Sequence, residues 1–520
     1  MSSSARPPNT VPSSDGERDD MATLAKGGRT NTIGFFIRLL GGLPFLFIGY
    51  RFYGVEDMGR FAVAFVVIEI FALFCALGEK RGLALRLTDN GDVSGVKPAN
   101  IVFDGMLAAF CISALIAVML ATFPAIMFPN GMNGSLDIWM VATIPAFALT
   151  EILLAAQAYK YDIATTVRAR ALVEPWARSL AVLAFFYIPG MRESGLALAF
   201  IFATYAGLAT AAFSFFRTYG LPENWRPRPR EMLRMVSRAF PLAGADVIER
   251  STRLIDVFLL GQFTSGTAVG IYFFAKEVAS LPQKLKQSFE PILSPVITKN
   301  LKIGNMDAIA KQVRQVGFWI IALQVGIALT LAIPGEAVMG LGGPAIVGGT
   351  GALVLLLAAE AIASMAVVAE SVLVYIAKKR NLLISAGIIT LQAALTVGFI
   401  MVADNLGLDE GFKAAGAALA LFVALGTSSL VKALLLKSLL KAPISNWRWA
   451  LVYAAAPAVV VGFLFTEFTP EWVEIVLGGP MILAVYLAVI WKRGFTDEDK
   501  MLFAKKEAPA QPDSAPEQSK

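Results

Sequence analysis

Apolar runs of about twenty residues recur along most of the chain, and they limit its fold more than any other feature. A helix needs about 20 apolar residues to cross a hydrocarbon core roughly 30 Å thick. We predict fourteen such spans, at 32–50, 58–78, 100–128, 136–158, 168–189, 194–216, 239–262, 267–290, 313–334, 346–376, 381–403, 413–437, 448–466 and 473–491. Only 16% of the residues are charged, against about 25% in soluble proteins. The pattern predicts an all-α, multi-pass membrane protein.

Basic residues gather in alternate loops between these spans. Loops rich in Lys and Arg face the cytoplasm. If the N-terminus is cytoplasmic, the inner loops and tail carry the basic clusters at 80–97, 160–170, 217–238, 299–314, 378–380, 437–448 and 492–506. The outer loops hold only Arg51, Arg60, Arg192 and Lys413. This asymmetry predicts an even number of spans with both termini in the cytoplasm.

Residues suited to catalysis or metal binding are scarce. The chain has no histidine, and its two cysteines, Cys75 and Cys111, lie in apolar runs. A disulfide framework or a metal cluster is therefore not indicated, and no Walker motif signals a nucleotide. The outer loops, such as PNGMNGSLD and TEFTPEW, leave no room for a catalytic domain. We expect no enzyme activity, no cofactor, no metal and no nucleic-acid partner.

A weak internal repeat divides the chain. The stretch from Arg38 and the stretch from Arg250 each read Arg, ten residues, Gly, a polar turn, a second Gly and an amphipathic helix. The copies lie six spans apart, which predicts two parallel, pseudo-symmetric six-helix lobes around a central cavity. The predicted units are a disordered tail (1–30), an N-terminal lobe (31–217), a basic linker (218–238), a C-terminal lobe (239–441), an additional two-helix hairpin (442–493) and a second disordered tail (494–520). No apolar core follows the first residues, so we expect no signal peptide.

Five charges interrupt the otherwise apolar stretch at 238–263. Asp246, Glu249, Arg250, Arg253 and Asp256 fall within an arc of roughly 120° if the stretch is one helix. A charge at the bilayer centre costs about 3 kcal/mol or more, so this face must meet a partner or a watery cavity. Mutual neutralisation through the spacings i,i+4 and i,i+3 within a packed bundle is the alternative.

Arg38 and Arg250 each lie eleven residues before a span-ending glycine, Gly49 or Gly261. Eleven residues of helix place them about 16 Å below the outer surface, near mid-membrane. Guanidinium groups bind phosphate through paired hydrogen bonds. The predicted diphosphate-binding residues are Arg38, Arg250, Arg253 and Lys276.

Carboxylates within the spans are candidate sites for a coupling ion. Glu69, Glu360 and Glu370 have no basic residue three or four positions away. Pairing with arginines of other helices is the competing interpretation. We take Glu174 and Arg178, an i,i+4 pair, as structural. The candidate ion-coupling residues are Glu69, Asp246, Glu249, Asp256, Glu360 and Glu370.

Two segments resemble signatures of Wzx-type polysaccharide and O-antigen flippases. GVEDMGRFAVAFVVIEIFALFCALG resembles the signature that follows the first span, and VGIYFFAKEVASLPQKLKQSFEPILSPVITK resembles the matching one in the second lobe. The signature positions are Gly54, Glu56, Gly59, Phe61, Gly78, Gly270, Tyr272, Ala275, Pro282, Pro291 and Pro295. This family belongs to the multidrug/oligosaccharidyl-lipid/polysaccharide (MOP) superfamily, with MurJ and MATE transporters. The resemblance implies a cavity bounded by spans 1, 2, 7 and 8.

The resemblance implies a flippase for a polyprenyl-diphosphate-linked oligosaccharide in the bacterial plasma (inner) membrane, serving surface polysaccharide biosynthesis. Its expected partners are that lipid-linked substrate, membrane lipids and a proton or sodium as coupling ion. A MATE-like drug or organic-cation antiporter is the alternative, and it predicts a cavity dominated by carboxylates. A membrane glycan polymerase or ligase is disfavoured by the short outer loops.

Overall fold

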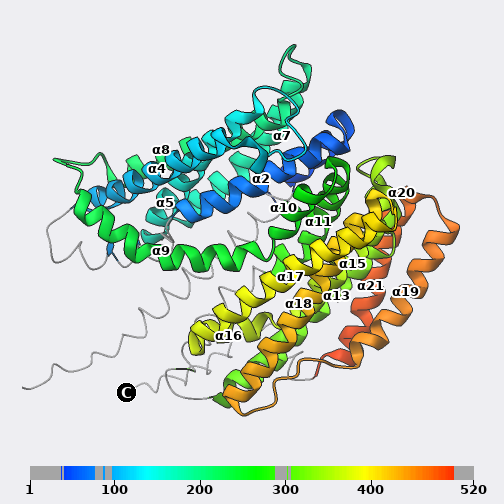
Figure 1. Cartoon of the computed structure of the whole chain (residues 1–520). Helices are drawn as coiled ribbons and strands as arrows, with labels where there is room; N and C mark the ends of the chain where they lie inside the picture. The colour runs from blue at the N-terminus through cyan, green and yellow to red at the C-terminus, as the bar shows by residue number, and fades with distance from the viewer. Residues whose placement is uncertain are drawn as a thin grey trace, which may run out of the picture.

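Every regular element in the described part of the chain is a helix. The computed structural model describes residues 37, 40–76, 83, 86–87, 97–286, 301 and 306–496. The tails predicted at 1–30 and 494–520 lie outside these residues, apart from 494–496, and so do Arg38, Gly78, Pro291 and Pro295. Figure 1 shows two helical bundles, one from each half of the chain, which meet at one end and diverge toward the other.

The N-terminal bundle comprises the helices between residues 40 and 219. They are a helix over residues 40–48, η1 (Gly49–Tyr53), α2 (Val55–Cys75), α4 (Pro98–Thr122), η2 (Pro124–Ile126), η3 (Asp137–Ala142), α5 (Thr143–Tyr159), α6 (Ile163–Thr166), η4 (Val167–Val173), α7 (Glu174–Tyr187) and α8 (Gly195–Tyr219). Local sequence sets several boundaries. Pro98 begins α4 at a position where no backbone donor is needed, and Gly220 ends α8 with a φ of 72°.

The second half begins with α9 (Pro229–Ser251), which follows a linker. The C-terminal bundle comprises α10 (Ile255–Phe263), α11 (Gly266–Lys286), α13 (Met306–Ala332), α14 (Gly335–Gly340), η5 (Pro344–Gly349), α15 (Thr350–Ser364), α16 (Val367–Ile376), α17 (Lys378–Asn405) and α18 (Glu410–Leu440). A hairpin follows, formed by α19 (Ala450–Phe468), α20 (Glu471–Val473), η6 (Glu474–Gly478), α21 (Gly479–Val489) and η7 (Ile490–Gly494). The hairpin packs on α13, where the ring of Tyr486 lies over Gly326.

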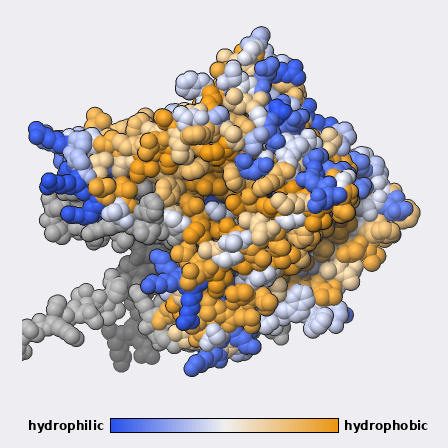
Figure 2. Space-filling view, in the orientation of Figure 1, coloured by the Kyte–Doolittle hydropathy of each residue, from blue (hydrophilic) through white to orange (hydrophobic). Residues whose placement is uncertain are grey.

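Ten described helices are long and apolar enough to cross a membrane. Figure 2 shows the corresponding hydrophobic surface over both bundles, with hydrophilic residues concentrated toward their ends. The chain is therefore a multi-pass membrane protein, as predicted. Helices also occupy the other four predicted spans, but they are too short, too polar or too incompletely described to meet the same criterion, so the number fourteen stays a prediction.

The predicted span 239–262 is two helices and not one, which corrects the assumption of a single charged arc. Helix α9 ends at Ser251, residues 252–254 form a turn, and α10 starts at Ile255. α9 packs on α2 and α4 of the N-terminal bundle and also on α17, whereas α10 packs on α11, α17 and α18 as well as on α2. The break therefore lies where the chain passes from one bundle to the other.

The bundles meet through a crossing of α2 and α11 that only glycines permit. A Cβ at Gly59 of α2 would overlap the carbonyl oxygen of Gly266, and a Cβ at Gly270 would overlap that of Val55. Gly266 and Gly270 have the small-xxx-small spacing that lets membrane helices approach closely. The Tyr50 hydroxyl also stabilises the crossing, because it donates a hydrogen bond of 2.5 Å to the Gly270 carbonyl oxygen.

Further hydrogen bonds join the bundles at the same end. Arg51 donates to the Gly340 carbonyl oxygen (3.1 Å), Asn130 to that of Gly261 (3.2 Å), and Gln262 to that of Ile126 (3.3 Å). We call this end the outer end, because the charge pattern predicts that it faces away from the cytoplasm, and the opposite end the inner end. The bundles are closed at the outer end and diverge toward the inner end (Figure 1).

Gly59→Ala is expected to lower the free energy of unfolding by about 1–3 kcal/mol, because the added methyl group must push α2 and α11 apart. Gly42→Ala is the matched control, since a Cβ at Gly42 meets nothing within 4 Å. Thermal unfolding of the purified variants in detergent measures the difference. Equal melting temperatures for the two variants would contradict the close crossing.

Candidate functional site

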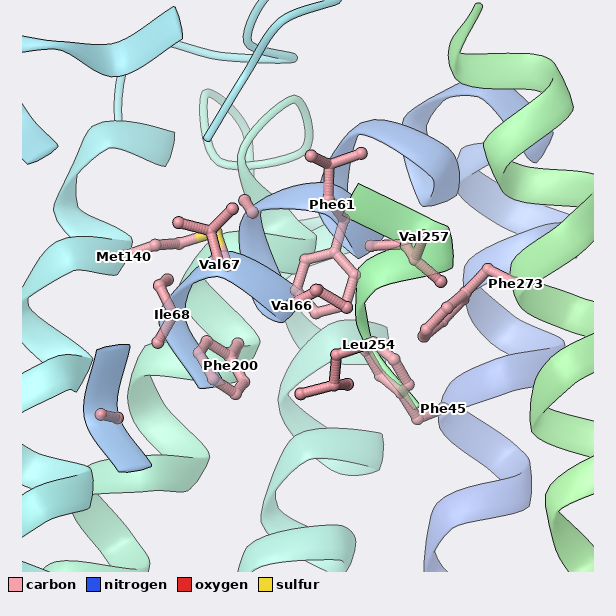
Figure 3. Packing of buried hydrophobic residues seen from close by; sticks show 14 of the residues in the cluster. Phe45, Phe61, Val66, Val67, Ile68, Met140, Phe200, Leu254, Val257 and Phe273 are labelled. Carbon is pink, nitrogen blue, oxygen red and sulfur yellow. The ribbon is translucent and has the colours of Figure 1, made fainter. Parts of the chain in front are cut away.

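A cavity of about 430 Å³ lies between the two bundles. Its walls come from residues 42–46, α2, η4, α7, α9, α10, α11, α15 and α18. Apolar side chains from both halves form part of the wall, and Figure 3 shows Phe45, Phe61, Leu254, Val257 and Phe273 grouped together. The charged side chains that line the cavity are Glu69, Arg170, Arg178, Arg250, Arg253, Lys276, Glu277 and Glu360.

Arg250, at the end of α9, reaches across to α2. Its Nη2 lies 2.8 Å from Oε1 of Glu69, and its Nε donates to the same oxygen at 3.3 Å. The Arg250 side chain keeps 49% of its surface exposed, whereas that of Glu69 keeps 16%. The pair therefore links α9 to the N-terminal bundle while leaving part of the guanidinium open to the cavity.

Arg253, three residues later, turns to the C-terminal bundle. Its guanidinium forms an ion pair with Glu360 of α15, and both side chains are mostly buried, with 21% and 10% exposed. Arg250, at the end of α9, and Arg253, in the turn before α10, therefore bind carboxylates from opposite halves of the molecule.

Lys276 of α11 forms the third ion pair of this wall. Its Nζ lies 2.5 Å from Oδ1 of Asp256, which is fully buried in α10. The Tyr272 hydroxyl donates to the other carboxylate oxygen, also at 2.5 Å. The Asp256 carboxylate thus binds two side chains of α11 and fixes α10 against it.

The N-terminal bundle contributes Arg170 and Arg178, which sequence reasoning did not propose as site residues. Arg170, in η4, binds Glu151 (2.6 Å) and Glu174 (2.7 Å), so Glu174 has a different partner from the Arg178 expected from spacing. Arg178 lies over the Phe45 ring, 4.6 Å from its centroid. The i,i+4 spacing of Arg170 and Glu174 was a usable signal, but nothing in the sequence placed either arginine on the cavity wall.

The structure brings together some predicted site residues and separates others. Arg250, Arg253, Lys276, Glu69 and Glu360 line one cavity, and Asp256 lies directly behind it. Glu370 instead pairs with Lys432 of α18 at 2.5 Å, and it does not line the cavity. Arg38 and the side chains of Asp246 and Glu249 lie outside the described residues.

Ion pairing between helices is the main electrostatic feature of this site. Arg250, Arg253 and Lys276, the predicted basic site residues that the structure describes, each have a carboxylate partner. The partners of the two arginines lie more than 100 residues away in the sequence. Among the residues that the structure describes, no three His, Cys, Asp or Glu side chains gather to hold a metal ion. The arrangement can bind an anionic group through guanidinium and ammonium donors once a carboxylate gives way.

Two bundles around a charged central cavity define a class of membrane transporter, and solved structures share this fold. The chain resembles a multidrug resistance MATE family transporter of the MOP superfamily in its inward-facing conformation, with 15% identity and a TM-score of 0.60 over 78% of this chain and 95% of that one. It also resembles the Vibrio cholerae MATE transporter VcmN in the bent form, with 15% identity and a TM-score of 0.53 over 81% and 98%. At such identities the likeness shows the fold alone.

The family follows from the sequence. Residues 25–301, just over half of the chain, match the family described as polysaccharide biosynthesis protein. The chain belongs to this family, which confirms the resemblance to Wzx-type flippases of the MOP superfamily. No curated protein sequence matches the chain. Family and fold are those of membrane transporters.

Arg170→Ala is expected to destabilise the protein by about 3–5 kcal/mol, because it leaves the carboxylates of Glu151 and Glu174 without their shared buried partner. Arg168→Ala, in the same η4 segment, is the control, since Arg168 is 57% exposed and such pairs contribute about 1 kcal/mol or less. Chemical or thermal unfolding in detergent compares the variants. A loss at Arg170 no larger than that at Arg168 would refute the structural role.

Proposed function

We propose that the protein is a flippase, which moves a polyprenyl-diphosphate-linked oligosaccharide from the cytoplasmic to the outer leaflet of a bacterial plasma membrane for surface polysaccharide biosynthesis. One observation carries the proposal: Arg250, Arg253 and Lys276 line a single cavity between two bundles that are closed at the outer end. Membership of the polysaccharide biosynthesis family supports the same substrate class.

The chemistry of the cavity suits the substrate head. A hydrated glycan with a diphosphate cannot cross hydrocarbon unaided, because desolvating polar and charged groups is costly. In the proposed binding mode, the half-exposed Arg250 contacts the diphosphate first, Arg253 and Lys276 contribute secondary contacts, and Arg38 of the other half completes the site. The glycan lies in the cavity, and the lipid tail leaves sideways between the bundles.

The orientation and the transport cycle belong to the same proposal. Both termini face the cytoplasm, so the diverging inner end admits substrate from the cytoplasmic leaflet. The bundles then rock until the outer contacts open. A proton or sodium gradient drives the cycle, with the carboxylates along the cavity as candidate coupling sites.

A MATE-like antiporter for organic cations is the second candidate, because the fold is that of MATE transporters and three carboxylates line the cavity. The cavity is not dominated by carboxylates, however, since basic side chains outnumber acidic ones along the described wall. Uptake assays in proteoliposomes separate the two candidates: a flippase moves a diphosphate-linked glycolipid, and an antiporter moves cations such as ethidium.

Arg250→Ala is expected to abolish export of surface polysaccharide while the protein still accumulates in the membrane, because the first anion contact is lost. Arg38→Ala is expected to have the same effect if that residue completes the site. Export is measured by complementing a host strain that lacks the gene, with protein levels measured in parallel.

Arg234→Ala is the matched control, because Arg234 is an exposed arginine on the same helix α9 and lies outside the cavity wall. It is expected to support normal export. Unchanged export in the Arg38→Ala, Arg250→Ala double variant would remove the proposed anion site.

A further inference from the structure

The resting cavity already contains anions at the positions where the proposed substrate would bind. Glu69 accepts two hydrogen bonds from Arg250, and Glu360 pairs with Arg253. A carboxylate offers a guanidinium the same kind of acceptor oxygens as a phosphate does. Each of these carboxylates therefore occupies donors that a phosphoryl group would need.

The two pairs differ in how readily they can exchange. Arg250 is 49% exposed and Glu69 is 16% exposed, whereas Arg253 and Glu360 are only 21% and 10% exposed. Solvent-exposed pairs contribute little to stability, while breaking a buried pair strands a charge away from water. A ligand in the cavity will thus displace Glu69 more easily than Glu360.

We propose that Glu69 is a stand-in anion, which holds Arg250 in the empty carrier and is displaced by the diphosphate of the substrate. This inference rests on the proposed flippase function and assigns to its site a competing residue. The more highly charged diphosphate displaces the single carboxylate from the guanidinium. This competition for Arg250 lowers the affinity for the substrate.

The exchange also removes an ion pair between α9 and the N-terminal bundle. In the empty state the Arg250–Glu69 pair links α9 to α2, in addition to the contacts at the outer end. When the diphosphate replaces Glu69, this link from α9 to the N-terminal bundle becomes a contact with ligand. Arg253 keeps its partner Glu360 in the C-terminal bundle, so the exchange removes only the ion pair with the N-terminal bundle.

Glu69→Gln in the full-length protein tests the exchange, with farnesyl diphosphate as the probe in detergent. The variant is expected to bind farnesyl diphosphate about two- to fivefold more tightly than the wild type, because a neutral amide competes less well for Arg250. In an Arg250→Ala background the same substitution is expected to give no gain, as a double-mutant cycle requires for direct competition.

Glu56→Gln is the matched control, because Glu56 is an exposed carboxylate on the same helix that pairs with Arg60 away from the cavity. It is expected to bind the probe like the wild type. If Glu69→Gln cannot be purified in a folded form, Glu69→Asp shortens the side chain and is also expected to tighten binding.

The outcomes separate this inference from the function beneath it. Binding by the wild type with equal or weaker binding by the Glu69 variants would overturn the exchange and leave the proposed flippase intact. No binding of farnesyl diphosphate by either wild type or variant would overturn both. A gain that persists without Arg250 would show that Glu69 repels the ligand directly and does not compete for the arginine.

Discussion

A charge within the hydrocarbon needs a partner, and this requirement organises the centre of the molecule. Leaving an arginine at mid-membrane without compensation costs about 3 kcal/mol or more. Arg250 lies at the end of α9 and Arg253 in the turn that follows, and they pair with carboxylates from opposite halves of the molecule. The turn between α9 and α10 therefore lies between the two bundles, within reach of carboxylates from both. The cavity lies there, lined by these ion pairs and by apolar side chains from both halves.

Close packing dominates at the outer end, where α2 crosses α11. Lipid tails are as apolar as leucine, so membrane helices associate through close van der Waals contact and hydrogen bonds and not through hydrophobic burial. Gly59, Gly266 and Gly270 supply the first, and Tyr50 supplies the second. A contact of this kind is short-ranged and is lost when the helices separate slightly. Such a contact is suited to holding the outer ends of the two bundles together in one state and letting them separate in another.

Most of the architecture could be predicted from the sequence, but few of the ion pairs between helices could. Apolar run length and loop charge predicted the membrane helices, and the offset between Arg38 and Arg250 predicted two related halves. The break at residues 252–254 was not predicted, because no Gly or Pro marks it in the sequence. Glu69 lies 181 residues from Arg250, and Glu360 lies 107 residues from Arg253, so no spacing rule links them. Spacing instead favoured Glu174 with Arg178, whereas Glu174 binds Arg170.

The basic side chains of the cavity are nearly balanced by acidic ones, which distinguishes it from a purely cationic site for an anion. Five basic side chains line the described wall, yet Glu69 and Glu360 lie beside two of them, and Asp256, Glu151 and Glu174 bind two others. An unopposed cluster of arginines would hold a diphosphate strongly, and a carrier that binds too tightly cannot release. In the proposed exchange, the internal carboxylates lower the net affinity for the diphosphate while keeping the donors in position. Because these carboxylates belong to the protein, each can pair with its arginine again when the proposed substrate leaves.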